Sequence, residues 1–323
     1  MPRLPTATVG PVAVQTATLE DAGAQAAMQP WIEMEYYQLS RGSRVGDIES
    51  LDLGALQVVR EGQHAAVQKL GATPANLCTI SFCTPDPGFR FSDRRSASAT
   101  EIFLMPEQTA FDLFVPAGAQ TTYVSLDQAA FLRDARALNP RSFERAPQQV
   151  MTFHTPHQAA FADALSVCFA AAGSGAASGQ RLDSRGIARA IFLSALHLVS
   201  AASADAFTPL AGWRSFRICR KARAFVEDRH DAEGVPSVAD LCAATGVSER
   251  SLQYAFRDYI GMSPVTYLRL CRLNRARAAL LEADPQASSV TEIAMHFGFE
   301  HLGRFAGDYR RLFDETPSAT LAG

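Results

Sequence analysis

Near the carboxyl end of the chain, polar side chains recur at the spacing of one exposed helix face. They are Ser248, Glu249, Arg250, Gln253, Tyr254 and Arg257. An arginine can donate two hydrogen bonds to O6 and N7 of guanine, and a glutamine can pair with N6 and N7 of adenine. Arg250 and Gln253 are therefore candidates for contacts with base edges, and Arg257 is a candidate for a phosphate contact. The alternative is an ordinary solvated helix face.

A second set of exposed positions is expected about fifty residues later. It comprises Glu300, His301, Leu302, Gly303, Arg304, Ala306, Gly307 and Asp308. The apolar members cannot hydrogen-bond bases through their side chains, but they would let the backbone approach closely or contact thymine methyl groups. Phosphate contacts and orientation are expected from His301, Arg304, Arg310 and Arg311. The first set should therefore carry most of the sequence preference.

The elements that must position these side chains are pairs of short helices joined by a glycine turn. The apolar residues of the first pair are Val238, Leu241 and Cys242 before Gly246, and Leu252, Phe256 and Tyr259 after it. Their spacing predicts one helix, a turn at Gly246, where a positive φ is tolerated, and a second helix capped by Ser248. Residues 238–259 are therefore predicted to form a helix-turn-helix.

The same pattern recurs over residues 290–312. Its apolar residues are Val290, Ile293, Ala294 and Phe297 before Gly298, and Phe305, Tyr309 and Leu312 after it. One such pair could be an ordinary αα-hairpin, but two in register favour a duplicated motif. Residues 264–281, which begin with a proline, are predicted to form a connecting helix about 27 Å long. Such a rod could hold two recognition helices roughly one turn of B-DNA apart, ~34 Å, so that both enter successive major grooves on one face.

The charge is distributed unevenly along the chain. The net charge of −3 does not favour nucleic acid by itself. From residue 250 to residue 277, however, six arginines stand against one acidic residue, Asp258. A local basic strip can bind phosphate whatever the sign of the total charge.

Residues 214–323 resemble the DNA-binding domain of the AraC/XylS family of bacterial transcription regulators. The matching segments are 241–248 (LCAATGVS), 252–256 (LQYAF), 261–264 (GMSP) with Tyr267, 273–276 (LNRA) and 293–299 (IAMHFGF), followed by Phe313 and Pro317. In that family, the positions of Arg250, Gln253 and Tyr254, and those of Leu302, Gly303, Ala306 and Gly307, face the major groove. The second set departs here from the family's usual polar residues. The resemblance implies a cytoplasmic homodimer that activates transcription through promoter DNA and RNA polymerase.

The rest of the chain predicts an α+β protein. Residues 32–124 carry short alternating runs separated by turn residues, which predict a β-sandwich or small barrel, and residues 126–202 are predicted to be helical. The glycine- and serine-rich residues 173–179 are predicted to form a flexible connection, and residues 203–213 a linker to the all-α domain at 214–323. The family resemblance implies that residues 1–202 form a cupin-like domain that binds an effector and dimerises.

One basic cluster in the β-rich part suggests an anionic effector. Arg90, Arg94 and Arg95 lie within six residues, and the R-x-x-x-R spacing resembles the arginine pair of PilZ-type cyclic di-GMP sites. Arginine suits such a ligand because its planar fork grips phosphate. Arg41 and Arg44 form a second basic candidate. An ordinary charged surface loop, or a regulator without a small-molecule ligand, stays an open alternative.

Other function classes find little support. His64, His154 and His157 lack the close pairing on one strand that a cupin-type metal site needs, so no metal or cofactor is expected. The six cysteines lack C-x-x-C spacing, which favours buried thiols in a reducing cytoplasm. No apolar run approaches the ~20 residues of a membrane span. We therefore expect no enzyme; the alternatives are an enzyme or repair protein with an attached DNA-binding domain, and a module that binds partner helices.

Overall fold

The computed structural model describes residues 14–86, 88–92, 94–95, 100–178, 183–204, 212–227 and 236–323. The strands are β1 (Val14–Leu19), β2 (Glu33–Gln38), β3 (Gly46–Asp52), β4 (Leu56–Gln63), β5 (Val67–Ala72), β6 (Leu77–Cys83), β7 (Arg90–Phe91), β8 (Arg94–Arg95), β9 (Glu101–Met105), β10 (Ala110–Val115), β11 (Gln120–Asp127), β12 (Met151–His154) and β13 (Ser203–Ala204). The helices are α1 (Ala22–Ala27), α2 (Gln128–Leu138), α3 (Pro140–Phe143), α4 (Gln158–Ser178), α5 (Ser184–Ser200), α6 (Gly212–Glu227), α7 (Val238–Thr245), α8 (Glu249–Tyr259), α9 (Pro264–Glu282), α10 (Val290–His296), α11 (Leu302–Phe313) and α12 (Pro317–Ala322).

The N-terminal strands form two antiparallel sheets. One has the order β1-β3-β4-β11-β6-β9-β12-β13 and the other the order β2-β5-β10-β7-β8. Side chains alternate between the two faces of a strand, so the larger sheet contributes to two apolar cores, one on each face. Tyr123 on β11 and its partner Val59 on β4 point into the core that the two sheets share, whereas Val124 and its partner Val58 belong to the core under the helices. The alternating pattern read from the sequence is therefore confirmed.

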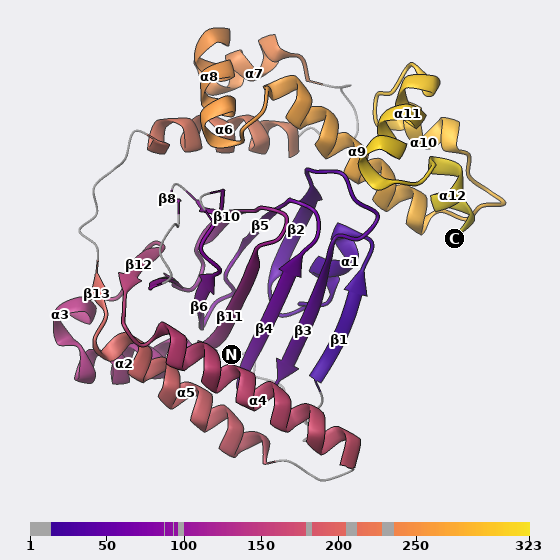
Figure 1. Ribbon diagram of the computed structural model, residues 1–323. Coiled ribbons are helices and arrows are strands. Elements are labelled where there is room, and N and C mark those ends of the chain that lie inside the picture. Colours follow the sequence, from indigo (N-terminus) through magenta and orange to yellow (C-terminus); the bar gives the residue numbers. More distant parts are fainter. Residues whose placement is uncertain are drawn as a thin grey trace.

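The helices cover the larger sheet and form the C-terminal region. Phe161 and Leu165 of α4 and Ile191 and Ala195 of α5 pack with the large sheet in one core, and both helices run along its outer side, away from α6–α12 (Figure 1). Helix α9 spans the C-terminal region: Tyr267 at its start packs with α6 and α8, and further along it joins the core of α10–α12. The protein thus has an antiparallel sheet-rich N-terminal region and a helical C-terminal region.

The two regions are packed against each other. Tyr37 and Leu70 of the smaller sheet, and Leu39 directly after β2, belong to the same apolar core as Phe256 and Tyr259 of α8. Hydrogen bonds cross the same boundary: the Tyr267 hydroxyl donates to the side chain of Gln68, and the backbone N–H of Gln38 donates to the side chain of Asn274. This contact fixes how the C-terminal helices lie on the small sheet.

Several boundaries differ from those predicted from the sequence. A strand, β1, lies within residues 1–30, which carry no clear pattern. Strand β12 lies in the part predicted to be helical, and the two-residue strand β13 lies at the start of the predicted linker. The glycine-rich residues 173–178, predicted to be a flexible connection, instead continue α4 as helix. The first C-terminal helix starts at Gly212, and residues 205–211 of the predicted linker lie outside the described part.

Candidate nucleic-acid interface

The first helix pair has the predicted local structure. Ser237 caps α7 through a reciprocal capping box with Asp240, and Gly246 ends the helix in the left-handed conformation, at φ 71°. Ser248 then caps α8, because its hydroxyl accepts a hydrogen bond from the backbone N–H of Ser251 at 3.3 Å. Each cap satisfies backbone N–H groups that the helix leaves free. The sequence signals for both helices are confirmed.

Helix α8 separates a buried face from a polar one. Leu252, Ala255, Phe256 and Tyr259 are buried. On the other side, Glu249, Arg250, Tyr254 and Arg257 are exposed, and Ser248 beside them is exposed too, while Gln253 is half-buried. Tyr254 is 69% exposed, which is high for an aromatic ring. Neither Arg250 nor Arg257 has an ion-pair partner in the described part of the chain. The predicted reading face of the first motif is therefore open to solvent.

The second helix pair has a similar design with a weaker cap. Ser289 and Glu292 form a capping box at the start of α10, and Gly298, at φ 73°, forms the turn. His301 is the N-cap of α11, but its side chain accepts no hydrogen bond from the helix. The imidazole ring therefore stays available for another partner.

The exposed face of α11 is partly bare of side chains. Leu302, Gly303, Arg304, Gly307 and Arg310 are exposed, with His301 ahead of them, and Ala306 is half-buried. A Cβ built at Gly303 or Gly307 would meet no atom within 4 Å. Glycine costs a helix roughly 0.5–1 kcal/mol relative to alanine, and the fold does not need the space. The bare backbone at these positions is therefore suited to the close approach of a partner.

Two predicted members of the basic and exposed sets serve the fold instead. Asp308 is buried, at 7% exposure. Its carboxylate forms an ion pair with Arg269 and accepts a hydrogen bond from Arg311 at 2.8 Å. Arg277, also predicted to belong to the basic strip, is buried and pairs with Asp21 at 3.1 Å and with Glu315. Helix periodicity alone did not reveal the partners Arg269, Asp21 and Glu315, since they lie outside the helix of the residue that they pair with.

Positive charge nevertheless gathers beside the start of α11. A cavity of about 250 Å³ is lined there by Arg269, Arg272, His301 and Arg304, among other residues. Burial, followed by the repulsion of Arg304 and Arg311, lowers the pKa of Arg269 from its ordinary value. Arg272 donates a hydrogen bond to the carbonyl oxygen of Gly298 at 3.1 Å, which braces the turn of the second motif. The crowding of arginines favours an anion at this surface.

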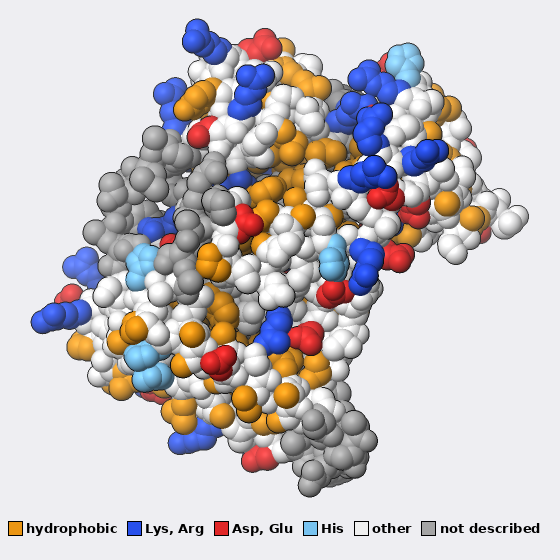
Figure 2. Space-filling model, in the orientation of Figure 1, with side chains coloured by type: hydrophobic (Ala, Val, Ile, Leu, Met, Phe, Trp, Pro, Cys, Tyr) orange, Lys and Arg blue, Asp and Glu red, His pale blue; other side chains and the backbone are white. Residues whose placement is uncertain are grey.

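The two recognition helices lie at one end of the molecule. Figure 1 shows α8 and α11 on the side away from α4 and α5, with α9 between them. Lysine and arginine side chains gather over the α9–α12 part of this end (Figure 2). That α8 and α11 enter successive major grooves of one duplex stays a prediction.

The arginines of the predicted effector site lie elsewhere than expected. For Arg90 the sequence leaves an effector site and an ordinary surface loop as alternatives, but the side chain is 4% exposed and lies between the two regions. Its guanidinium donates to the carbonyl oxygen of Tyr259, lies 3.7 Å from the centre of the Tyr259 ring and faces Asp112 at 3.7 Å. Arg94 is half-buried, and the side chain of Arg95 lies outside those described. Arg90 lies on β7 and contacts Tyr259 at the end of α8, so the docking of the two regions buries it.

The histidines that the structure describes are not gathered into a metal site. His64 pairs with Asp47 at 2.6 Å, and the rings of His157 and His197 lie 4.1 Å apart. Within the described ranges, no group of three or more histidine, cysteine or acidic side chains has the geometry to hold a metal ion. Among the same residues, no helix is long and apolar enough to cross a membrane.

Comparisons with known proteins bear on the C-terminal third. A family described as "Helix-turn-helix domain" matches residues 241–323. The chain is 46% identical over 85 residues to the probable thc operon regulatory protein of Rhodococcus erythropolis and 42% identical over 85 residues to the XylDLEGF operon transcriptional activator of Pseudomonas putida. Each match covers 26% of this chain and 26% of the relative. A solved structure of a probable AraC family transcriptional regulator from Rhodopseudomonas palustris is 34% identical, with 32% of this chain and 94% of that chain covered and a TM-score of 0.30.

Proposed function

Because the C-terminal domain of the chain belongs to the AraC/XylS family, we propose that the protein is a sequence-specific DNA-binding regulator that activates transcription. The observation that carries this proposal is the pair of capped helix-turn-helix motifs, whose recognition helices α8 and α11 keep their polar and bare faces exposed while the full chain is folded. An open α8 allows its first turn to enter a major groove. Relatives over the matched segment are operon regulators and activators, which favours regulation over enzymatic activity.

The roles of individual residues follow from exposure and chemistry. Arg250 and Gln253 are proposed to read base edges, with Tyr254 beside them and Ser248 and Arg257 towards the backbone. On α11, Leu302, Gly303, Ala306 and Gly307 would lie against the groove, and His301, Arg304 and Arg310 would bind phosphates. Because α8 has more hydrogen-bonding side chains, we assign most of the sequence preference to it.

The N-terminal region is proposed to control the DNA-binding domain. Its domain boundaries, residues 1–202 for effector binding and dimerisation and 214–323 for DNA binding, are part of the proposal. An effector that binds two domain arrangements with different affinity would shift the balance between them. A cytoplasmic homodimer that contacts RNA polymerase is the assembly in which such control would act.

A cyclic dinucleotide such as cyclic di-GMP is one candidate effector. Arg90 would have to leave Asp112 and Tyr259 to bind it, so binding would separate the two regions. Calorimetry with cyclic di-GMP on the full chain and on Arg90→Ala tests this; the absence of heat with the wild-type chain would exclude this effector.

Genomic footprinting of the full chain tests the function itself. We expect protected sites upstream of a small set of genes, and binding to isolated sites that weakens steeply with added salt, because phosphate contacts release counterions. A protein that protects no promoter and binds no duplex at low salt is not a regulator of this kind. A chain that binds apolar helices but no DNA would instead be a protein-interaction module.

A further inference from the structure

A loop of the N-terminal region completes the end of the second recognition helix. The backbone N–H of Gly42 and the side-chain amide of Gln38 donate hydrogen bonds to the carbonyl oxygen of Leu312, at 3.0 and 3.2 Å. This carbonyl belongs to the last turn of α11, where a helix leaves its oxygens without partners. The loop between β2 and β3 therefore caps α11 from outside its own domain.

Buried polar contacts hold the loop in this position. The side chain of Asn274 on α9 accepts from the backbone N–H of Gln38 at 2.8 Å and donates to its carbonyl oxygen at 2.9 Å, as a neighbouring strand would. Gln38 is fully buried, and the buried Arg277 of the same helix pairs with Asp21 at 3.1 Å. Breaking such buried pairs leaves polar groups unsatisfied, which costs more than breaking exposed ones. These contacts hold the β2–β3 loop at a fixed position relative to α9 and α11.

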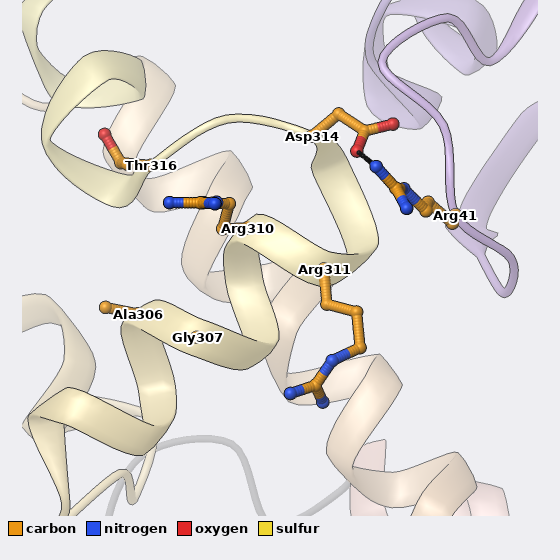
Figure 3. Close-up of a pocket in the computed structure, with 7 residues that line it drawn as sticks. All are labelled: Arg41, Ala306, Gly307, Arg310, Arg311, Asp314 and Thr316. Atoms are coloured by element: carbon orange, nitrogen blue, oxygen red, sulfur yellow. Dashed lines mark hydrogen bonds and ion pairs between the residues drawn. The ribbon is translucent and has the colours of Figure 1, made fainter.

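The loop brings Arg41 to the exposed side of α11. A cavity of about 640 Å³ opens there, bordered by Arg41 from the N-terminal region and by Ala306, Gly307, Arg310 and Arg311 from α11. Arg41 and Arg310 extend beside the last turn of α11 (Figure 3). The cavity therefore adjoins the bare face of α11. Three guanidinium groups, those of Arg41, Arg310 and Arg311, and the carboxylate of Asp314 border it.

The state of the Arg41 side chain leaves it free to bind an anion. Its Nε and Nη2 both face one oxygen of Asp314, at 2.6 Å, so the remaining N–H groups have no partner there. The side chain is 72% exposed. An exposed ion pair of this kind contributes little to stability, and a guanidinium offers five N–H donors in all. Arg41 can therefore keep Asp314 and still donate to a phosphate.

We propose that Arg41 binds a backbone phosphate of DNA at the edge of the groove that α11 enters, beside the phosphate bound by Arg310. The inference rests on the proposed function, and it adds a DNA contact from the N-terminal region. Arginine suits this role because its planar fork donates two parallel hydrogen bonds to phosphate. The DNA-binding surface is then composite, and it is complete only while the two regions are docked.

A composite surface couples DNA binding to the docking of the two regions. A duplex held by Arg41 and α11 together binds the docked arrangement more tightly than the separated one. By linkage, separating the two regions weakens DNA binding, and bound DNA favours the docked arrangement by the same factor.

The test uses the full chain and a random-sequence duplex of about 40 base pairs, roughly four helical turns. Because a phosphate contact is independent of sequence, no operator is needed. Arg41→Ala should weaken binding roughly tenfold at low salt and reduce the slope of log affinity against log salt by about 0.9. Asp314→Asn, which removes a negative charge from the same site and tolerates the left-handed backbone there, at φ 59°, should strengthen binding.

The opposite signs separate DNA contact from a structural role. If Arg41 only ties the regions together through Asp314, both substitutions change affinity in the same direction, and the inference is wrong. Arg133→Ala is the matched control: Arg133 is 70% exposed and pairs with Asp134 on α2, so its loss should leave both affinity and slope unchanged apart from a general charge effect. Should the wild-type chain bind no duplex, the proposed function fails; should it bind while Arg41→Ala matches Arg133→Ala, only this inference fails.

Discussion

Replacing Gly307 with alanine should move stability and DNA affinity in opposite directions. Gly307 lies in the sixth position of α11 with a helical backbone, and a Cβ at this position would meet no protein atom within 4 Å. The methyl group therefore introduces no clash within the fold. Since alanine in a helix is more favourable than glycine by roughly 0.5–1 kcal/mol, urea unfolding of Gly307→Ala should show a more stable protein by about that amount.

The Gly307→Ala substitution should weaken DNA binding, because the added methyl group would occupy the space in front of α11 where the duplex is proposed to lie. If the backbone at Gly307 rests against the duplex, an added methyl group must be accommodated by a shift of α11 or of the DNA. Overpacking of one group into a close contact costs about 1–3 kcal/mol, which corresponds to a loss of affinity of roughly fivefold to 150-fold. Fluorescence anisotropy with a labelled promoter fragment measures this loss directly.

A matched control lies in the N-terminal region. Gly173 is exposed within α4, and a Cβ there also meets nothing within 4 Å, so Gly173→Ala should stabilise the chain to a similar degree and leave DNA binding unchanged. If Gly307→Ala stabilises the chain and binds DNA as tightly as the wild type, Gly307 does not face the duplex. A Gly307→Ala chain that is not stabilised would show that the space in front of the helix is already used.

Three further outcomes are expected. Arg250→Ala should relax specificity at one base pair and cost roughly 1–3 kcal/mol on the best site; equal weakening on a set of single-base variants of that site would reject its role in reading bases. Asp112→Ala removes the carboxylate that faces the buried Arg90, so urea unfolding should show a loss of about 3–5 kcal/mol, and a loss below about 1 kcal/mol would mean that the arginine finds another partner. Burial raises the pKa of Tyr309 to about 12 and that of Tyr267 well above its ordinary value; because the unfolded chain ionises tyrosine near about 10, stability should fall as the pH rises above that value, by at most about 1.4 kcal/mol per pH unit for each tyrosine. Unfolding measured at about pH 9 and pH 11 checks the sign, and equal stability at the two values would contradict it.

The helix-turn-helix motifs were readable from the sequence because their signals are local. A capping serine, an apolar seam and a turn glycine lie within one or two helical turns of each other, so Ser248, Leu252 and Gly246 could be assigned without knowledge of the rest of the chain. The exposed positions of α8 followed from the same periodicity. The register of the two copies added a second, independent reason to expect two motifs.

The partners of charged side chains could not be read in this way. Asp308 and Arg277 fall at positions that periodicity cannot distinguish from solvated ones. Asp308 pairs with Arg269 on α9, and Arg277 pairs with Glu315 between α11 and α12 and with Asp21 near the N-terminus. Arg90 lies about 170 residues before Tyr259, whose carbonyl oxygen it binds. Contacts between residues so far apart depend on how the regions dock, which no local pattern encodes.

The sequence by itself determined the two helix-turn-helix motifs. Helix caps and apolar spacing specify α7–α8 and α10–α11, because each of these signals acts over one or two helical turns. Only the tertiary structure decided which arginines face outwards. Arg41, separated from α11 by most of the chain, reaches the recognition surface because Gly42, Gln38 and Asn274 join the β2–β3 loop to α9 and α11. The reason is physical: side-chain exposure depends on packing between distant segments, whereas helix formation depends mainly on neighbours.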